Sequence, residues 1–294
     1  MIILFFCLSL SAASESVEAK RSSYIGVSAT RSSSEYQDQR LLGSLGVTEK
    51  WLLDVSFFRS DSGLSRTGNE ELISTELRAG ADFQAGDQYG FKAEAIHRKD
   101  PYELLGLGAG FGGNYGLHTI WGGELLTDLS FKLESIRYQQ QIKYTGALSS
   151  FTIDRDVTQR LFEVALTQEV TRWFLATLSI RRYNYTEGIN KLSVTTARRQ
   201  TTFARGRNSY GLPDREQDLS VTISPRSWLS LKLGVARSQI VNDDEELKSR
   251  RSEVTFYWRD FDLALEYAHS DFGDTSGDDN SVQEFGSVSL GYQF

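Results

Sequence analysis

The sequence predicts an all-β fold, a single closed antiparallel β-barrel of about 14 strands crossing a membrane, and three observations lead to it. Apolar and polar residues alternate along most of the 294-residue chain, as in strands with two different faces. Short polar connections alternate with longer ones. The mean hydropathy is only −0.36 although 12% of the residues are aromatic, and no internal run would make a transmembrane helix. A barrel in lipid hides its apolarity in alternation.

The alternation defines fourteen expected strands. They cover residues 25–29, 41–47, 51–57, 73–83, 89–95, 117–125, 129–133, 162–170, 174–180, 219–223, 229–235, 254–258, 261–267 and 287–294. An even number returns both termini of the chain to the same side of the membrane. Because two segments can be interpreted in more than one way, strand counts of 12 and 16 are alternatives. The glycine-rich segment 103–116 fits a flexible hairpin above the membrane, a segment folded into the lumen, or a strand, and 191–207 alternates in part.

The last strand carries the most specific signal. One face is apolar or aromatic, the other is small and polar, and the chain stops on an aromatic residue. The apolar positions are Val288, Leu290, Tyr292 and Phe294. This strand resembles the C-terminal assembly signal of Gram-negative outer-membrane β-barrels. The resemblance is to porin-like proteins as a class. It implies an outer-membrane location and recognition by the outer-membrane assembly machinery.

The chain start fits that location. Residues 2–10 form an apolar run that is shorter than the roughly 20 residues needed to span a bilayer, and small residues follow it. We therefore expect a secretory signal peptide in residues 1–19, cleaved after Ala13 or Ala19, and the barrel in residues 20–294. The single cysteine, Cys7, lies within this signal, so the mature chain has no thiol for a disulfide or a metal.

Six short connections predict the periplasmic side of the barrel. They are residues 48–50, 86–88, 127–128, 171–172, 224–227 and 259–260. An aromatic residue lies at or just beyond most of them, and amphipathic rings favour the membrane interface. The predicted periplasmic girdle consists of Trp51, Tyr89, Phe131, Trp173, Trp228 and Phe261. The alternate connections are longer and polar, as in the extracellular loops of outer-membrane barrels.

The inward phase of the predicted strands carries many charges, which would be very costly against an apolar core but not beside water. The predicted lumen-lining residues are Asp54, Glu76, Arg78, Asp82, Lys92, Glu94, Glu124, Lys132, Glu134, Glu163, Glu169, Arg181, Lys232, Glu253, Arg259, Asp262 and Glu266. Barrels of about eight strands are filled by side chains and those of roughly 16–18 strands are open, so a narrow aqueous channel is expected here. Acidic residues predominate, which predicts weak cation preference.

The expected function is a porin-like channel for passive diffusion of small polar solutes or ions. A non-conducting surface receptor, adhesin or scaffold is the alternative, and an outer-membrane hydrolase is a second alternative. The histidines, His97, His118 and His269, fall near the extracellular strand ends, but no catalytic motif surrounds them. We therefore predict no enzyme activity, no catalytic residues and no cofactor.

The remaining expectations concern ligands and partners. The acidic loops 242–246 and 271–280 lack the spacing of an EF-hand, so no metal site is predicted. The basic segment 191–207 fits either a solvated loop or a contact with lipopolysaccharide phosphates. Expected partners are outer-membrane lipid and lipopolysaccharide, the assembly machinery and small polar solutes. The net charge of −7 argues against a nucleic acid, and we expect a monomer.

Overall fold

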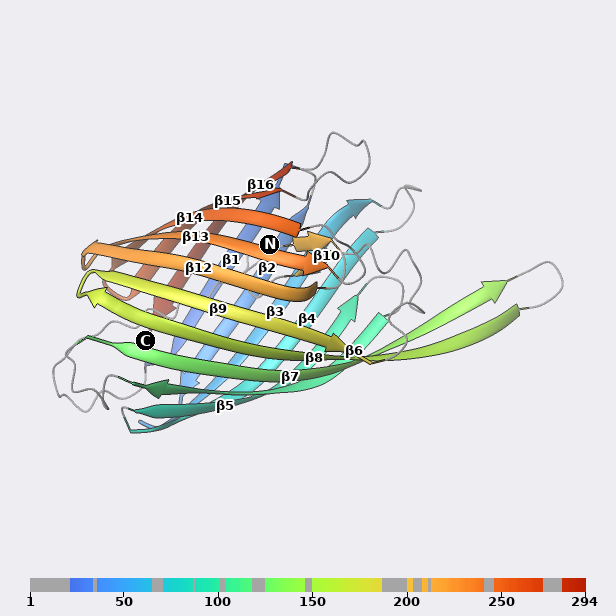
Figure 1. Ribbon diagram of the computed structural model, residues 1–294, viewed down its shortest axis with the longest axis horizontal. Helices are drawn as coiled ribbons and strands as arrows, with labels where there is room; N and C mark the ends of the chain where they lie inside the picture. The colour runs from blue at the N-terminus through green and yellow to red at the C-terminus, as the bar shows by residue number, and fades with distance from the viewer. Residues whose placement is uncertain are drawn as a thin grey trace.

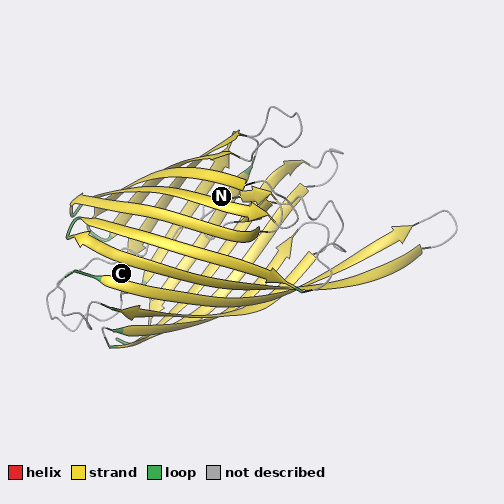
Figure 2. Cartoon of the chain, in the orientation of Figure 1, coloured by secondary structure: helices red, strands yellow, loops and turns green. Residues whose placement is uncertain are grey.

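In the computed structural model every regular element is a β-strand (Figures 1 and 2). The structure describes residues 22–33, 36–64, 71–86, 88–100, 104–117, 125–145, 150–186, 200–202, 208–210, 213–240, 246–271 and 282–294. The described residues contain no helix long and apolar enough to cross a membrane. The predicted signal peptide lies outside them.

Fourteen strands form one closed antiparallel barrel, which confirms the predicted fold and strand count. Each strand pairs with its neighbours in the chain, except that β9 pairs with β12 and β16 pairs with β1. The strands are β1 (Tyr24–Ser32), β2 (Gln37–Gly46), β3 (Trp51–Leu64), β4 (Glu71–Ala85), β5 (Tyr89–Asp100), β6 (Leu104–Gly116), β7 (Thr127–Thr145), β8 (Ser150–Thr171), β9 (Phe174–Tyr185), β12 (Pro213–Arg226), β13 (Leu229–Ile240), β14 (Glu246–Trp258), β15 (Phe261–Asp271) and β16 (Val282–Gln293). A separate two-stranded sheet joins β10 (Gln200–Thr202) and β11 (Asn208–Tyr210).

The barrel closes where the first strand meets the last. The ladder between β1 and β16 runs from Tyr24 opposite Gln293 to Ser32 opposite Phe285. Beyond it, the backbones of Ser23 and Phe294 exchange two hydrogen bonds of 2.9 Å each. An open strand edge in lipid would leave backbone groups without partners, so this closure is what allows the wall to lie in a membrane.

The two faces of the wall are the reverse of those in a soluble protein. On β16, Val288 and Leu290 are 53% and 47% exposed, whereas their neighbours Ser287 and Ser289 are buried. The same alternation runs along the other barrel strands, with large apolar side chains outside and mostly polar ones inside. Such a wall matches a barrel surrounded by hydrocarbon.

The connections differ between the two ends of the barrel (Figure 1). We call the end at which β1 begins and β16 finishes the termini end, and the opposite end the loop end. Two-residue turns at the termini end join β8 to β9, β12 to β13 and β14 to β15. The six aromatic residues of the predicted girdle are all exposed. The centre of the Tyr292 ring lies 4.8 Å from that of Phe261, whose ring is tilted by 36° to it, and 5.9 Å from that of Phe294, on which it stacks.

The sixth strand of the barrel is β6 instead of the predicted residues 117–125. Of those residues, 118–124 lie outside the described part of the chain, and the described residues 117 and 125 are not in a strand. The predicted turn at 127–128 is also wrong, because β7 already begins at Thr127 and Phe131 lies within it. The error has a physical cause: glycine is depleted in strands, so the alternating glycines of 104–116 indicated a loop. The structure uses them as one complete face of a strand, the third of the three interpretations.

Strands β7 and β8 are longer than the sequence predicted. Their mutual ladder reaches Thr145 opposite Ser150. The ladder of β7 with β6 ends at Gln139, and that of β8 with β9 begins at Gln159. The two strands therefore continue as a hairpin beyond the rest of the wall at the loop end (Figure 1).

The assignment of outer and inner faces can be tested on β13. Leu233 is 42% exposed and lies opposite Val221 and Ser252 in the middle of the wall. Replacing Leu233 with Arg should destabilise the barrel in a bilayer by about 2–4 kcal/mol, because the charge enters hydrocarbon. The adjacent inward residue provides the control, Lys232→Arg, which should change little. Reversible denaturation in lipid vesicles measures both, and equal effects would contradict the assigned faces.

Candidate functional site on the inner wall of the barrel

Along each barrel strand, every second residue is an outward one, as the exposed apolar residues are. The residues between them face the inside of the barrel, and we call the surface that they form the inner wall. The positions in this phase include all but two of the predicted lumen-lining residues. Glu124 lies outside the described residues. Arg259 lies in the two-residue turn between β14 and β15 with a φ of 54°, and its guanidinium stands 5.8 Å from the centre of the Trp258 ring. Arg259 is therefore an exposed residue of the termini end.

A cluster of five charged residues dominates one side of the inner wall. We call it the Arg78 cluster; its members are Glu76, Arg78, Glu94, Lys132 and Glu134. The Arg78 guanidinium lies 2.6 Å from Glu76, 3.1 Å from Glu94 and 2.8 Å from Glu134. Lys132 Nζ lies 2.6 Å from Glu94 and 2.9 Å from Glu134. Arg98, 4.0 Å from Glu76, supplies a third positive charge, so cations and carboxylates balance.

This cluster joins strands that are not neighbours. Arg78 is on β4 and Glu134 is on β7, and three strand spacings amount to about 14 Å. Two strands lie in between, β5 and β6, and β6 presents glycines to the lumen. A Cβ on Gly110 would lie 2.7 Å from Glu94 Oε1 and 2.8 Å from Glu94 Cγ. The bare face of β6 therefore gives the side chains of β5 and β7 the room to meet above it.

The register aligns these residues in one row across the wall. Asp54, Glu94 and Glu134 on β3, β5 and β7 alternate with Gly80 and Gly110 on β4 and β6. Carboxylates thus stand on every second strand, separated by strands without a side chain. The cations that hold them come from adjacent rows.

The same arrangement recurs around the barrel. Lys92 on β5 reaches Asp54 on β3, with Nζ 3.0 Å from Oδ2, across the strand that carries Gly80. A Cβ on Gly80 would lie 2.9 Å from Asp54 Oδ1. Arg251 on β14 donates hydrogen bonds of 2.7 and 2.9 Å to both carboxylate oxygens of Asp218 on β12.

Glycine again lies under the second of these pairs. A Cβ on Gly234 of β13, between β12 and β14, would lie 2.5 Å from Arg251 Nε. On β16, a Cβ on Gly291 would collide with Tyr24 of β1 and Asp262 of β15. We call these residues, Gly80, Gly110, Gly234 and Gly291, the inner glycines. Each lies beneath polar side chains that come from the strands on either side of it.

A second cluster lies beside the first. Arg181 on β9 is directly opposite Glu163 on β8 and Glu216 on β12, and its guanidinium lies 3.0 Å and 3.2 Å from their carboxylates. Glu163 is also directly opposite Lys132, so the two clusters are adjacent. Closer to the loop end, a chain of hydrogen bonds runs from Tyr138 through Gln159 to Tyr185.

Several charged residues of the inner wall were missed from the sequence. They are Asp38, Arg40, Arg98, Asp128, Glu216, Asp218 and Arg251. Most lie beyond the ends of the predicted strands: β12 begins at Pro213 instead of 219, and β14 at Glu246 instead of 254. Extending the period-two pattern backwards would have found Glu216 and Asp218, which have the same phase as Ser220. The ion pairs of these residues depend on the register with neighbouring strands. The period-two pattern of a single strand therefore could not predict them.

No arrangement suited to catalysis is found among the described residues. His97 and His269 both belong to the outward phase, and Ser270, between His269 and Asp271, is buried on the inner side. The third histidine, His118, lies outside the described residues. The described residues contain no group of three or more His, Cys, Asp or Glu side chains that could hold a metal ion.

Two solved structures with a similar fold are described as a transporter and as a channel. The toluene transporter TodX of Pseudomonas putida aligns with a TM-score of 0.53 and 10% identity, covering 94% of this chain and 91% of TodX. A shortened TodX variant, described as a monoaromatic hydrocarbon channel, aligns with a TM-score of 0.52 and 10% identity, covering 92% of this chain and 88% of the variant. No family model and no curated protein matches the sequence. The chain therefore shares the closed antiparallel β-barrel fold of these structures.

Replacing Gly110 with Ala tests the role of the inner glycines. The new methyl group would displace Glu94 from Arg78 and Lys132, and overpacking of this kind costs about 1–3 kcal/mol. Gly286→Ala is the matched control, because a Cβ on Gly286 meets nothing within 4 Å. Denaturation in vesicles measures both variants. A loss of stability in the control as large as in Gly110→Ala would refute a specific role for the space above β6.

Proposed function

We propose that the protein is an outer-membrane channel for passive diffusion of small polar solutes or ions. The observation that carries this proposal is a closed wall that is apolar outside and ionic inside. In a packed apolar core, the ion pairs around Arg78 and Arg181 would destabilise the fold, because burial removes water from their charges. Beside water they form a polar lining for a solute.

The location and orientation are part of the proposal. We infer that the termini end faces the periplasm and the loop end faces the exterior, because short turns lie on the periplasmic side of outer-membrane barrels. Residues 1–19 then serve as the secretory signal, and the aromatic residues of the termini end lie at the periplasmic interface of the outer membrane. The barrel is proposed to act as a monomer, since one chain closes it.

The inner wall favours a polar solute over an apolar one. TodX is described as a toluene transporter. In this protein, the inner wall instead carries guanidinium, ammonium and carboxylate groups on most strands. Acidic residues are in excess on the inner faces of β14 and β15. Glu253 lies directly opposite Glu266, and Asp262 lies four residues before Glu266 on the same face. The nearby cations are Lys232, directly opposite Glu253, and Arg251, which pairs with Asp218. We therefore infer a preference for cations.

A surface receptor, adhesin or scaffold is the second candidate. The observation in its favour is the hairpin of β7 and β8, which extends past the barrel wall where neither strand has another neighbour in the barrel ladder. Conductance in a planar bilayer separates the two candidates. Folded protein that inserts without conducting would contradict the channel and favour the scaffold.

The cation preference yields a specific test. Replacing Glu253 and Glu266 with Gln should lower cation selectivity at about 0.1 M salt, where charges act over about 10 Å, and change it little at about 1 M. The measurement is the reversal potential across a salt gradient. The control replaces two carboxylates of the outward phase, Asp156 and Glu246, with Asn and Gln, so that the net charge changes equally. Unchanged selectivity in the Glu253 and Glu266 variant would contradict the inferred preference.

The proposed assembly signal can be separated from stability. Phe294→Ala keeps the backbone bonds to Ser23 and removes one ring that is 63% exposed, so the folded barrel should lose at most about 1.5–3 kcal/mol. In cells, the amount in the outer membrane should fall much more than this loss explains. Trp258→Ala removes a ring of the same end, 71% exposed, without changing the last residue. Equal outer-membrane amounts of the two variants would leave Phe294 as an ordinary interfacial aromatic.

A further inference from the structure

The outer surface of the barrel carries a concentrated group of cations near the loop end. We call it the cationic patch; it consists of Arg182, Arg215, Arg237, Lys248 and Arg250 on β9, β12, β13 and β14. All five side chains are exposed and belong to the outward phase. The outward cations of the other side, Arg31, Arg59 and Lys99, are single residues on separate strands.

The register brings like charges face to face within this patch. Arg182 lies directly opposite Arg215, and Arg237 lies directly opposite Lys248. Arg250 follows Lys248 on the same face of β14, about 7 Å further along the strand. Facing like charges destabilise a sheet, so the patch costs stability unless an anion lies between them.

Neighbouring carboxylates only partly provide that anion. Glu246 Oε1 lies 3.9 Å from Arg237 and Glu246 Oε2 lies 3.7 Å from Lys248, both beyond hydrogen-bond length. Asp271 is opposite Lys248 on β15. Among the described residues of the outward phase, the five cations therefore outnumber the two carboxylates that lie beside them.

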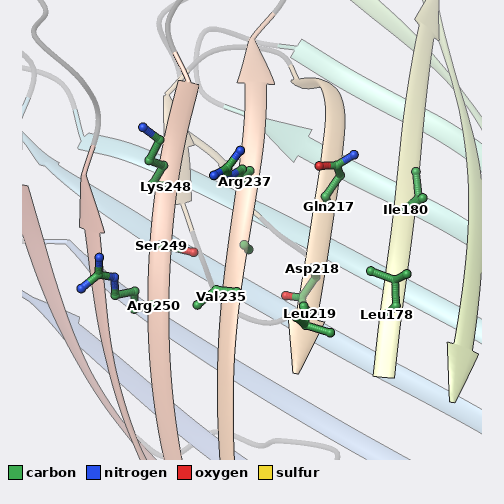
Figure 3. A pocket seen from close by; sticks show the side chains of 11 residues that line it. Leu178, Ile180, Gln217, Asp218, Leu219, Val235, Arg237, Lys248, Ser249 and Arg250 are labelled. Carbon is green, nitrogen blue, oxygen red and sulfur yellow. The ribbon is translucent and has the colours of Figure 1, made fainter. Parts of the chain in front are cut away.

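An apolar surface lies directly beside the cations. A hollow of about 510 Å³ on the outer wall is lined by Arg237, Lys248 and Arg250 and by four exposed apolar side chains, Leu178, Ile180, Leu219 and Val235 (Figure 3). Leu178, Leu219 and Val235 lie in one row toward the middle of the wall, with Arg250 directly opposite Val235. Ile180, Arg237 and Lys248 lie in the next outward row, toward the loop end (Figure 3). A ligand that fits this surface has an anionic head and a hydrocarbon body.

We propose that the cationic patch binds the phosphorylated headgroup of lipopolysaccharide, the lipid A unit, with its acyl chains along Leu178, Ile180, Leu219 and Val235. Arginine donates two parallel hydrogen bonds to a phosphate, and the two facing pairs suit a headgroup with two phosphates. The proposal rests on the outer-membrane location and orientation given above but not on the channel. The proposal places the lipopolysaccharide contact on strands of the barrel wall, whereas the sequence had suggested the basic segment 191–207.

Native mass spectrometry of the detergent-solubilised protein with added bisphosphorylated lipid A tests this proposal. Wild-type protein should carry one lipid. Replacing Arg237, Lys248 and Arg250 together with Gln should weaken binding by about tenfold or more, since hydrogen bonds to charged groups are lost. The control replaces Arg31, Arg59 and Lys99 with Gln and should bind within about twofold of wild type, because these cations lie outside the patch.

Two further measurements use the unchanged protein. Dephosphorylated lipid A and phosphatidylglycerol should both bind more weakly than bisphosphorylated lipid A, and rising salt should weaken the binding of the latter. The proposal is overturned if the patch variant binds like wild type, if the control variant loses as much, if either comparison lipid binds as tightly, or if salt has no effect. This experiment does not measure conductance. A negative result would therefore overturn the proposed lipid A site without testing the proposed channel.

Discussion

The hydrogen-bonding requirement of the backbone determines the rest of this structure. In hydrocarbon no water is present to pair with a free N–H or C=O, so the sheet must close on itself. The ladder between β1 and β16, with the paired backbones of Ser23 and Phe294, completes that closure. Once the wall is closed, one face meets lipid and the other meets the lumen, and strict alternation along each strand follows.

The polar face then has to satisfy its own charges. Ion pairs between adjacent strands, such as Arg181 with Glu163, need only the ordinary strand spacing. Pairs such as Asp218 with Arg251 span a strand in between and need that strand to carry no side chain at the crossing. The inner glycines meet this need. A residue type that normally weakens a strand here permits ion pairs to cross from one side of that strand to the other.

Local pattern was sufficient for some features and insufficient for others. Alternation alone predicted the strand count and the phase of strands such as β5, because lipid and lumen impose it on every residue. It failed at β6, where Gly106, Gly108, Gly110 and Gly112 remove the polar half of the signal. It also missed the partners of the charges: that Glu94 and Glu134 flank Gly110 depends on the register of three strands, which no single segment contains.

The contacts above the inner glycines also bear on how the strands find their alignment. A slip of two residues between neighbouring strands preserves the apolar and polar faces, so alternation alone does not oppose it. After such a slip the row of Asp54, Glu94 and Glu134 would no longer align with Gly80 and Gly110. Beside β4, the carboxylates of Asp54 and Glu94 would then face Arg78 or Asp82 instead of Gly80. Beside β6, where Gly108 and Gly112 flank Gly110, the slip would instead separate Arg78 from Glu134 and Lys132 from Glu94. The polar contacts of the inner wall thus help to specify the strand register, which the apolar outer face alone does not.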